Sequence, residues 1–267
     1  MATMALLLQY NGAGYHGFAT QKPHNGRDLA TVQGELNRAL EVLYRRPVDT
    51  TCAGRTDAGV HALGQVISYD VSEEELETRT PRVLLRSLNA LTPEDMGVRD
   101  VWQAADGFSA RFDAQWREYR YYLSVGPLPP LVMADFCWHL RCEPLDIQAM
   151  NEAAQYLIGE HDFKSFCLAA SAVGKPTCRN VLDLSVAPVQ IAGQDLVCIR
   201  VVGSSFLHSM VRTIAGTLVA VGRGLREPAW VDSVLKACSR DAAGEKAPAQ
   251  GLVFWQVGYE GYNRHLG

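Results

Sequence analysis

The segment CAGRTDAGVH, from Cys52 to His61, places a single carboxylate where a reacting group would be useful. Asp57 lies between two glycines and two residues after Arg55. A nearby guanidinium keeps a carboxylate ionised, and an ionised, positioned carboxylate suits nucleophilic or base chemistry on a sugar. The flanking glycines let the backbone approach a ligand closely. A turn aspartate on the surface is the alternative interpretation of the same residues.

A second charged residue, Arg212, lies within the apolar run FLHSMVRTIAG. An unpaired charge among apolar neighbours is costly, which favours a carboxylate partner such as Asp57. A side chain that reaches solvent from the edge of a helix would explain this arginine equally well.

The run WREYRYY, from Trp116 to Tyr122, combines aromatic and basic side chains. On a strand, Tyr119 and Tyr121 share one face, and Arg120 shares the other with Tyr122. Rings that stack on bases and cations that meet phosphates suit a nucleic-acid ligand. A strand whose tyrosines only pack in the core is the alternative.

The segment from His161 to Arg179 shows little periodicity, so we expect a long loop of the kind that forms lids or binding sites. It carries the basic residues Lys164, Lys175 and Arg179, which are candidates for substrate binding.

A metal site has little support, because neither the histidines nor the cysteines have ligand spacing. Seven cysteines without a CxxC pair indicate the reduced thiols of a cytoplasmic protein.

The segment GAGYHG, from Gly12 to Gly17, matches the GxGxxG pattern of dinucleotide-binding proteins. In that pattern a helix must start at once so that its N-terminus can hold the pyrophosphate. Here Pro23, Asn25 and Gly26 delay the next helix until about residue 31. We therefore interpret the segment as a glycine-rich turn and expect no nucleotide cofactor.

The composition is that of a globular chain of 267 residues, 48% hydrophobic and 20% charged. No run approaches the roughly 20 apolar residues that span a bilayer, and the N-terminus lacks the basic region of a signal peptide. A net charge of −4 argues mildly against a nucleic-acid partner, although a basic cleft on an acidic protein would still allow one.

The elements that must position these residues follow a β-α-β-β-α-β order in the first half of the chain, and the second half repeats that outline with additions. The order predicts an α+β fold of two ferredoxin-like (split βαβ) halves, residues 1–107 and 108–267, with a central, mostly antiparallel sheet and a cleft between the halves. Asp57 then falls in the connection between two central strands. We expect strands at Met4–Tyr10, Val48–Cys52, Gly64–Val71, Gly97–Trp102, Tyr119–Val125, Phe136–Leu140, Val181–Val186, Leu196–Val202 and Leu252–Tyr259, and helices after Thr31 and Thr80 and at Asp146–Ile158 and Phe206–Val221.

The chain resembles the tRNA pseudouridine synthase A family along nearly its whole length. Eight stretches carry the resemblance, in the order YNGAGYHGF, TVQGELNRAL, AGRTDAGVHALGQV, FSARFDAQWREYRYYL, GEHDFKSF, TCRNV, FLHSMVRTIAGTLVAVG and APAQGLVFWQVGY. The resemblance implies the pseudouridine synthase fold, Asp57 as the catalytic aspartate, Tyr119 as the ring that stacks on the target uracil, and Arg212 as the partner of the aspartate. It also implies a homodimer without a cofactor that acts on uridines 38 to 40 of the tRNA anticodon stem-loop.

This reaction breaks the N1–C1′ bond of uridine, turns the base and rejoins it through C5. Asp57 would attack C1′, attack C6 or remove the 2′ proton, and the sequence leaves all three open. We expect Arg55 to help hold the flipped nucleotide. An RNA-binding chaperone without the chemistry, and a synthase for another RNA, are the alternative functions.

The chain departs from the family pattern in two places. His16–Gln21 reads HGFATQ where the family has a pattern like YGWQRQ, and the loop KPHNGRDLA that follows is longer than usual. Both departures lie where RNA contacts are expected, so they bear on which tRNAs are modified.

Overall fold

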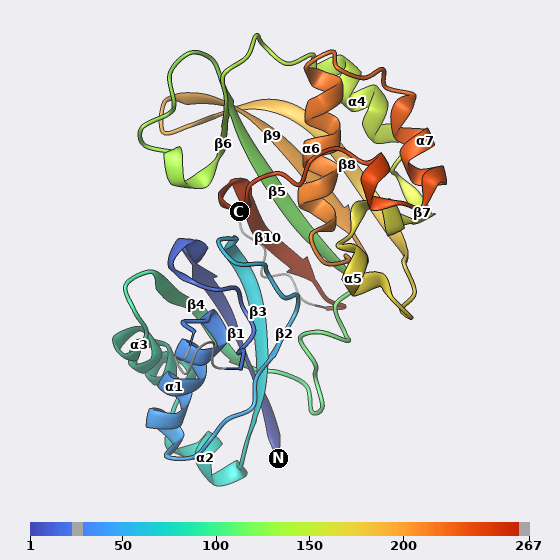
Figure 1. Ribbon diagram of the computed structural model, residues 1–267. Coiled ribbons are helices and arrows are strands. Elements are labelled where there is room, and N and C mark those ends of the chain that lie inside the picture. Colours follow the sequence, from blue (N-terminus) through green and yellow to red (C-terminus); the bar gives the residue numbers. More distant parts are fainter. Residues whose placement is uncertain (23–28, 262–267) are drawn as a thin grey trace. The chain divides into compact units, whose positions relative to one another are not determined.

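The structure is a computed structural model that describes residues 1–22 and 29–261 (Figure 1). Most of the long loop KPHNGRDLA therefore lies outside the described residues. The chain forms two compact units, Met1–Gln115 together with the chain from Phe254 onward, and Trp116–Val253. The predicted halves, 1–107 and 108–267, divide the chain at one position. In the structure, the last strand of the chain instead belongs to the sheet of the first unit.

The sheet of the first unit has the strand order β4-β1-β3-β10, and β2 pairs with β3. Strand β1 runs antiparallel to both neighbours, with Leu6 opposite Ile67 on β3 and Val101 on β4. Eight of the nine residues of β1 are buried, as its almost continuous apolar sequence indicates. The strands are β1 (Ala2–Tyr10), β2 (Thr51–Cys52), β3 (His61–Val71), β4 (Met96–Gln103) and β10 (Leu252–Gly258).

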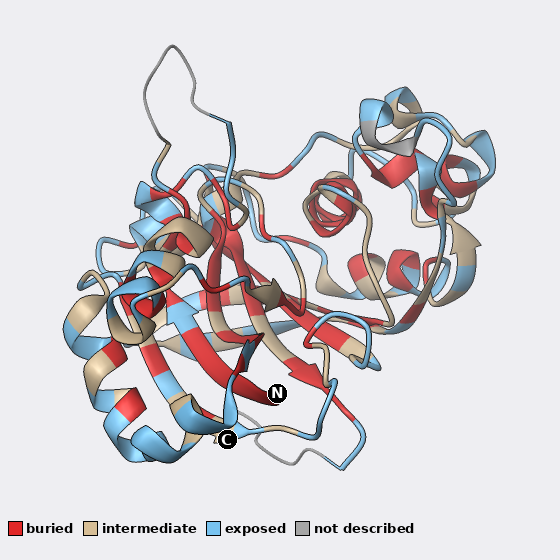
Figure 2. Ribbon diagram, turned by 90° about the horizontal axis from the view of Figure 1, so that it is seen from below, coloured by how far each residue is buried: buried red, intermediate tan, exposed pale blue. Residues whose placement is uncertain are grey.

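Two helices of this unit begin where the sequence predicts. Thr31 caps α1 (Val32–Tyr44) by accepting a hydrogen bond from Gly34 N, and Thr80 caps α3 (Pro81–Leu91) with proline at the first helical position. A further helix, α2 (Glu73–Thr78), was not predicted; it begins with a capping box formed by Ser72 and Glu75. Helices α1 and α3 expose one face and bury the other, whereas β1 and β3 are mostly buried (Figure 2).

The second unit has the strand order β5-β9-β8-β7, and the short strand β6 pairs with β5. All of these pairs are antiparallel except β5–β6. Helix α4 contacts both α6 and α7. The elements are β5 (Trp116–Val125), β6 (Trp138–Leu140), α4 (Ile147–Gln155), β7 (Gly159–Asp162), α5 (Ala169–Ala172), β8 (Cys178–Ile191), β9 (Gln194–Gly203), α6 (Met210–Gly222) and α7 (Trp230–Ala237). The prediction of a mixed α and β fold with mostly antiparallel pairing is confirmed.

The structure differs from several local predictions. The helix expected at Phe206–Val221 begins only at Met210, because Ser209 has a left-handed backbone with φ of 61°. The segment 161–179, which was expected to be a loop, contains the last residues of β7, a 3₁₀ turn, α5 and the first residues of β8. Phe163 and Phe166 anchor that 3₁₀ turn in the core, where both are fully buried. Helix α7 was not predicted.

None of the helices in the described part of the chain is long and apolar enough to cross a membrane.

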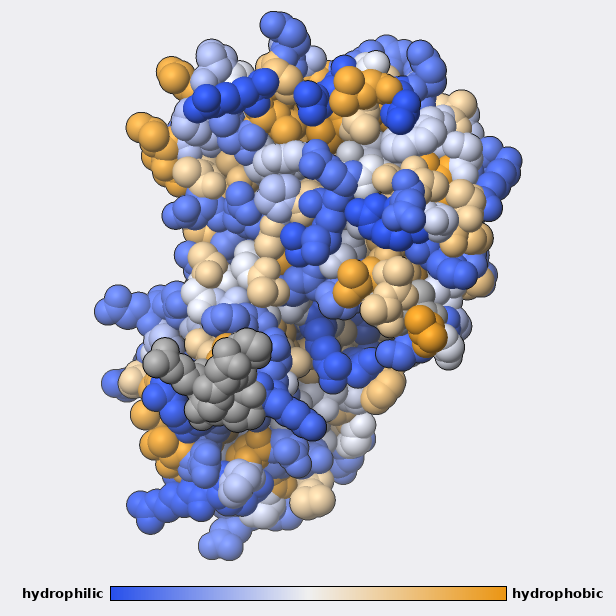
Figure 3. Space-filling view, viewed as in Figure 1, coloured by the Kyte–Doolittle hydropathy of each residue, from blue (hydrophilic) through white to orange (hydrophobic). Residues whose placement is uncertain are grey.

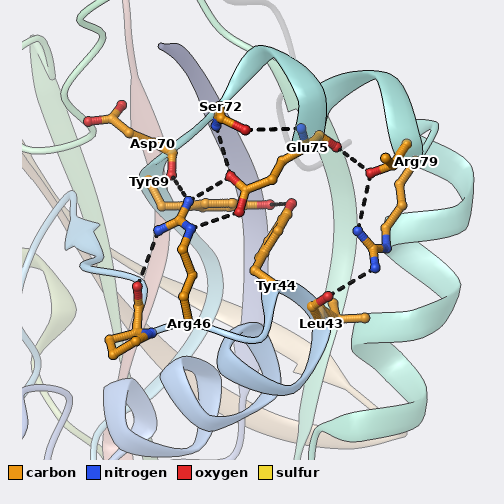
Figure 4. Close-up of polar contacts among 10 residues, drawn as sticks. Leu43, Tyr44, Arg46, Tyr69, Asp70, Ser72, Glu75 and Arg79 are labelled. Atoms are coloured by element: carbon orange, nitrogen blue, oxygen red, sulfur yellow. Dashed lines mark hydrogen bonds and ion pairs between the residues drawn. The ribbon is translucent and has the colours of Figure 1, made fainter.

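A polar cluster joins the end of α1 to α2 (Figure 4). Arg46 binds Glu75 with two hydrogen bonds, Nε to Oε1 and Nη2 to Oε2, each 2.7 Å long. The guanidinium groups of Arg46 and Arg79 lie 5.8 and 5.7 Å from the ring centroid of Tyr44. The hydrogen bond from Arg46 lowers the pKa of Glu75 to about 2, against an opposing effect of burial and with further help from the Ser72 backbone N–H.

We expect Glu75→Gln to lower the free energy of unfolding by about 1 kcal/mol at neutral pH. The side chain of Arg46 is 41% exposed, so solvent screens the pair and the effect is smaller than the pKa change alone implies. Because the folded state lowers the pKa from 4.5, the stabilisation is present above that pH and is lost as the pH falls towards 2. Urea unfolding of both proteins at a series of pH values measures this convergence.

Glu74→Gln is the matched control, because Glu74 lies beside Glu75 in the first turn of α2 and also faces the helix dipole. Its effect on stability should be smaller. A stability difference for Glu75→Gln that stays constant from neutral to acid pH would contradict the assignment to this ion pair.

Candidate active site

The loop that carries Asp57 connects β2 to β3 and is anchored at its start by Gln65. The side chain of Gln65 is fully buried and makes two bonds to one residue: its Oε1 accepts from Gly54 N at 3.3 Å, and its Nε2 donates to Gly54 O at 2.6 Å. Ala53 N also donates to Val66 O. A polar amide directly before an apolar run of β3 was the available sequence signal for this anchor, and it was not used in the prediction.

Thr56 fixes the backbone immediately before Asp57. Its hydroxyl lies 2.8 Å from the hydroxyl of Tyr10, and both residues are buried. Its carbonyl accepts a hydrogen bond from Phe18 N at 3.1 Å. The turn closes through Val60 N, which donates to Asp57 O at 3.2 Å. Asp57 is only partly buried, so its carboxylate is carried by a rigid backbone next to solvent.

The glycine-rich first turn packs directly against this loop. A Cβ at Gly12 would lie 2.0 Å from Val60 O, and Gly17, with φ of 101°, approaches Thr56 O closely. Gly12 N donates to Nδ1 of the buried His61 at 3.1 Å. The glycines therefore serve the close approach of two loops, which agrees with the interpretation of GAGYHG as a turn.

Arg55 is exposed, and its charge acts on the start of the Asp57 loop. Burial raises the pKa of the Cys52 thiol to about 11, while the positive charges of Arg55 and Arg111 lower it in opposition. Both guanidinium groups thus lie near Cys52, the last residue of β2. Of the predicted site residues, the structure places Asp57 and Arg55 together on one loop of the first unit.

The predicted stacking residue, Tyr119, lies on β5 in the second unit, opposite Val201 on β9. It is 7% exposed, and its ring meets Phe206 edge to face at a centroid distance of 5.1 Å. Tyr121, two residues on, is fully buried and donates its hydroxyl proton to Pro248 O at 2.8 Å. Phe206, the aromatic neighbour of Tyr119, was not among the predicted site residues.

Arg120, the predicted basic residue on the other face of β5, pairs with the buried Glu118. Glu118 is 1% exposed and binds Nε of Arg120 at 2.8 Å and Nε of Arg200 at 3.1 Å. A buried carboxylate is stable only when it is paired, so these two arginines neutralise Glu118.

Arg212 projects from α6 towards the segment that leads into β10. Its Nε donates to Ala247 O at 2.8 Å, and Ala247 N donates back to Arg212 O at 3.1 Å. Burial raises the pKa of Tyr121, and the charge of Arg212 is the largest opposing influence, which places the guanidinium near that ring. Arg212 is partly buried, whereas its helix neighbours Val211 and Thr213 are buried.

The same segment is held along α6 by close backbone contacts. A Cβ at Gly216 would lie 1.9 Å from Glu245 O, and one at Gly244 would lie 2.7 Å from Cα of Thr217. Nη1 of Arg240 donates to Gly244 O at 2.9 Å. The backbone that Arg212 contacts is therefore fixed independently of Arg212.

The three predicted basic contacts differ in their surroundings. Lys164 and Lys175 are exposed. Arg179 is partly buried and donates from Nη1 to Pro176 O and Cys178 O, at 3.1 and 2.6 Å, which shapes its own loop. All seven cysteines lie in the described ranges and are free thiols. Within residues 1–22 and 29–261, no group of three or more His, Cys, Asp or Glu side chains could hold a metal ion.

Comparison with known proteins assigns this arrangement to a family. A family model described as tRNA pseudouridine synthase matches residues 153–260. The tRNA pseudouridine synthase A of Brevibacillus brevis is 40% identical over 97% of this chain and 100% of that protein. The enzymes of the same name from Aliivibrio salmonicida and Bacillus licheniformis are 39% and 38% identical, each over 96% of this chain and over 92% and 99% of their own lengths. The chain therefore belongs to the tRNA pseudouridine synthase A family.

Proposed function

We propose that this protein converts uridine to pseudouridine at positions 38, 39 and 40 in the anticodon stem-loop of tRNA, with Asp57 as the essential catalytic group. Membership of the family gives the reaction, an isomerisation of uridine in tRNA. The positions follow from the family pattern. The observation that carries the proposal is the rigid, glycine-flanked loop that holds a single carboxylate, Asp57, beside an exposed arginine, Arg55.

The chemistry requires a positioned carboxylate and an aromatic surface. The N1–C1′ bond breaks, the base turns, the C5–C1′ bond forms, and the proton from C5 leaves while N1 gains one. A paired uridine must first leave the helix, at a cost of a few kcal/mol. In the proposal Asp57 acts on the sugar or the base, Tyr119 stacks on the uracil, and Arg212 is the partner of the aspartate. Arg55, Lys164, Lys175 and Arg179 are the proposed substrate-binding residues.

We also propose the finer features that the family pattern implies. These are two ferredoxin-like halves, a cytoplasmic location and a homodimer that works without a cofactor. In the first unit β1 lies between β4 and β3, and β3 also pairs with β2; these three pairs are antiparallel, which supports a split βαβ arrangement there.

Release of tritium from C5 tests the function directly, because the new C5–C1′ bond displaces the C5 hydrogen. The purified protein should release tritium from a transcribed tRNA labelled at its uridines, with or without EDTA. A tRNA with cytidines at positions 38 to 40 is the control and should release none. Absence of release from the first tRNA would overturn the function, and equal release from the control would overturn the positions.

A further inference from the structure

A tight turn at Ser109–Asp113 in the first unit is fixed by its own side chains. Asp113 N donates to Ser109 O at 3.1 Å, and Ser109 N donates to Oδ2 of Asp113 at 2.8 Å. Phe112 N donates to the hydroxyl of Ser109 at 3.3 Å. Such reciprocal bonds hold a short loop in one conformation.

Two side chains from the sheet also hold the centre of this turn. Ala110 N donates to the hydroxyl of Ser68 on β3 at 3.0 Å, and the hydroxyl of Tyr259, just after β10, donates to Ala110 O at 2.6 Å. Ala110 and both partners are buried. The two backbone polar groups of Ala110 are thus satisfied inside the unit, so the residues that follow it have a fixed position.

The side chains that this rigid turn presents are an arginine and a phenylalanine. Phe112 is 81% exposed, and the guanidinium carbon of Arg111 lies over its ring, 5.5 Å from the centroid. Hydrophobic residues reach the surface at scattered places on the molecule, as Figure 3 shows, so exposure alone does not mark Phe112 as functional. The combination of an exposed ring, a cation and a fixed backbone is what distinguishes this turn.

The turn is anchored next to the start of the Asp57 loop. Ser68, whose hydroxyl accepts the hydrogen bond from Ala110 N, lies directly opposite Thr51 in the β2–β3 pair. Thr51 is the residue before Cys52. The charges of Arg111 and Arg55 both act on the Cys52 thiol, which agrees with this placement. Two exposed arginines, one of them beside an exposed ring, therefore act electrostatically at the start of the loop that carries Asp57.

We propose that Arg111 and Phe112 form a second contact for the substrate RNA, in which Phe112 stacks on a base and Arg111 meets a phosphate of the strand that carries the target uridine. The inference rests on the proposed function. Single-stranded and flipped nucleotides are bound through aromatic rings that stack on bases and cations that meet the backbone. A preformed contact loses little conformational entropy on binding, which suits a substrate that must be distorted before it reacts.

Replacement of Phe112 tests the stacking contact. Phe112→Leu keeps an apolar side chain but removes the ring, and should raise the dissociation constant for tRNA by about 5- to 100-fold. Phe112→Tyr keeps the ring and should bind within about threefold of wild type. Tyr156→Leu, which removes another exposed ring, is the matched control and should bind as wild type. Equal binding by wild type and Phe112→Leu, or equal loss in the Leu and Tyr variants, would overturn the contact.

Replacement of Arg111 tests the phosphate contact. Arg111→Gln should reduce the slope of log affinity against log salt concentration by about 1, because one fewer counterion is released. Arg82→Gln, at an exposed arginine on α3, should leave the slope unchanged. An unchanged slope in Arg111→Gln would exclude the phosphate contact. A variant at either position that alters the sedimentation of the free protein and leaves tRNA affinity intact would assign the turn to a protein interface instead.

The two proposals fail in different ways. If the wild-type protein releases no tritium from tRNA, the proposed function is wrong. If it releases tritium and the variants bind tRNA as wild type does, only the contact at Arg111 and Phe112 is wrong. Because Phe112 is 81% exposed, its variants should unfold at the wild-type temperature, so weaker binding will not reflect misfolding.

Discussion

Asp57→Ala is expected to abolish pseudouridine formation while the affinity for tRNA stays within a few-fold of wild type. Loss of a catalytic acid–base or nucleophilic group lowers the rate by at least about 100-fold. The hydrogen bond that closes the turn uses Asp57 O, and the bonds of Thr56 and Gly54 fix the rest of the loop, so the substitution leaves the backbone in place. Single-turnover tritium release and a filter-binding titration measure the two quantities separately.

Two further variants make this result specific. Asp57→Asn keeps the size and polarity of the side chain and removes its charge, so it should be as inactive as Asp57→Ala. Asp49→Ala removes an exposed carboxylate from the same unit and should keep its activity. Residual activity of Asp57→Ala above about 1% of wild type would contradict a nucleophilic or base role.

The sequence predicted best those parts of the fold whose signals are local. The caps at Thr31 and Thr80 satisfy the first free N–H groups of α1 and α3, and each can be recognised from a few neighbouring residues. The long strands β1, β3 and β9 follow from runs of apolar residues that the structure buries. The candidate loop is likewise recognisable from its own short sequence, because a single aspartate there lies between two glycines and close to an arginine.

The parts that the sequence did not predict depend on contacts between distant residues. Phe163 and Phe166 pack in the core, so a segment that reads as a loop is ordered by tertiary burial instead of periodicity. The left-handed backbone at Ser209 delays the start of α6, and no glycine stands at that position to indicate it in the sequence. The turn at Ser109–Asp113 is held by Ser68 on β3 and Tyr259 just after β10, which no local pattern connects.

Arg212→Met should reduce the rate of pseudouridine formation by about 10²- to 10³-fold, the usual effect of removing one positioned charge from an active site. Arg212→Lys should also be impaired, by about tenfold or more, since an ammonium lacks the planar pair of donors that holds a carboxylate in one orientation. Initial rates at saturating tRNA provide the measurement. This prediction follows from the proposed pairing of Arg212 with Asp57.

The bond from Arg212 to Ala247 O raises a structural explanation that must be separated from the catalytic one. Arg240 provides the matched control, because it is also partly buried and donates to a carbonyl of the same segment, Gly244 O, at 2.9 Å. Each Met variant loses at least the charged hydrogen bond to this segment, so both should lose about 1.5–3 kcal/mol of unfolding free energy or more. Only Arg212→Met should lose the rate, whereas Arg240→Met should stay within about threefold of wild type. Equal loss of rate in the two variants would show that Arg212 acts by holding the segment at 244–247 on α6 and has no separate part in the chemistry.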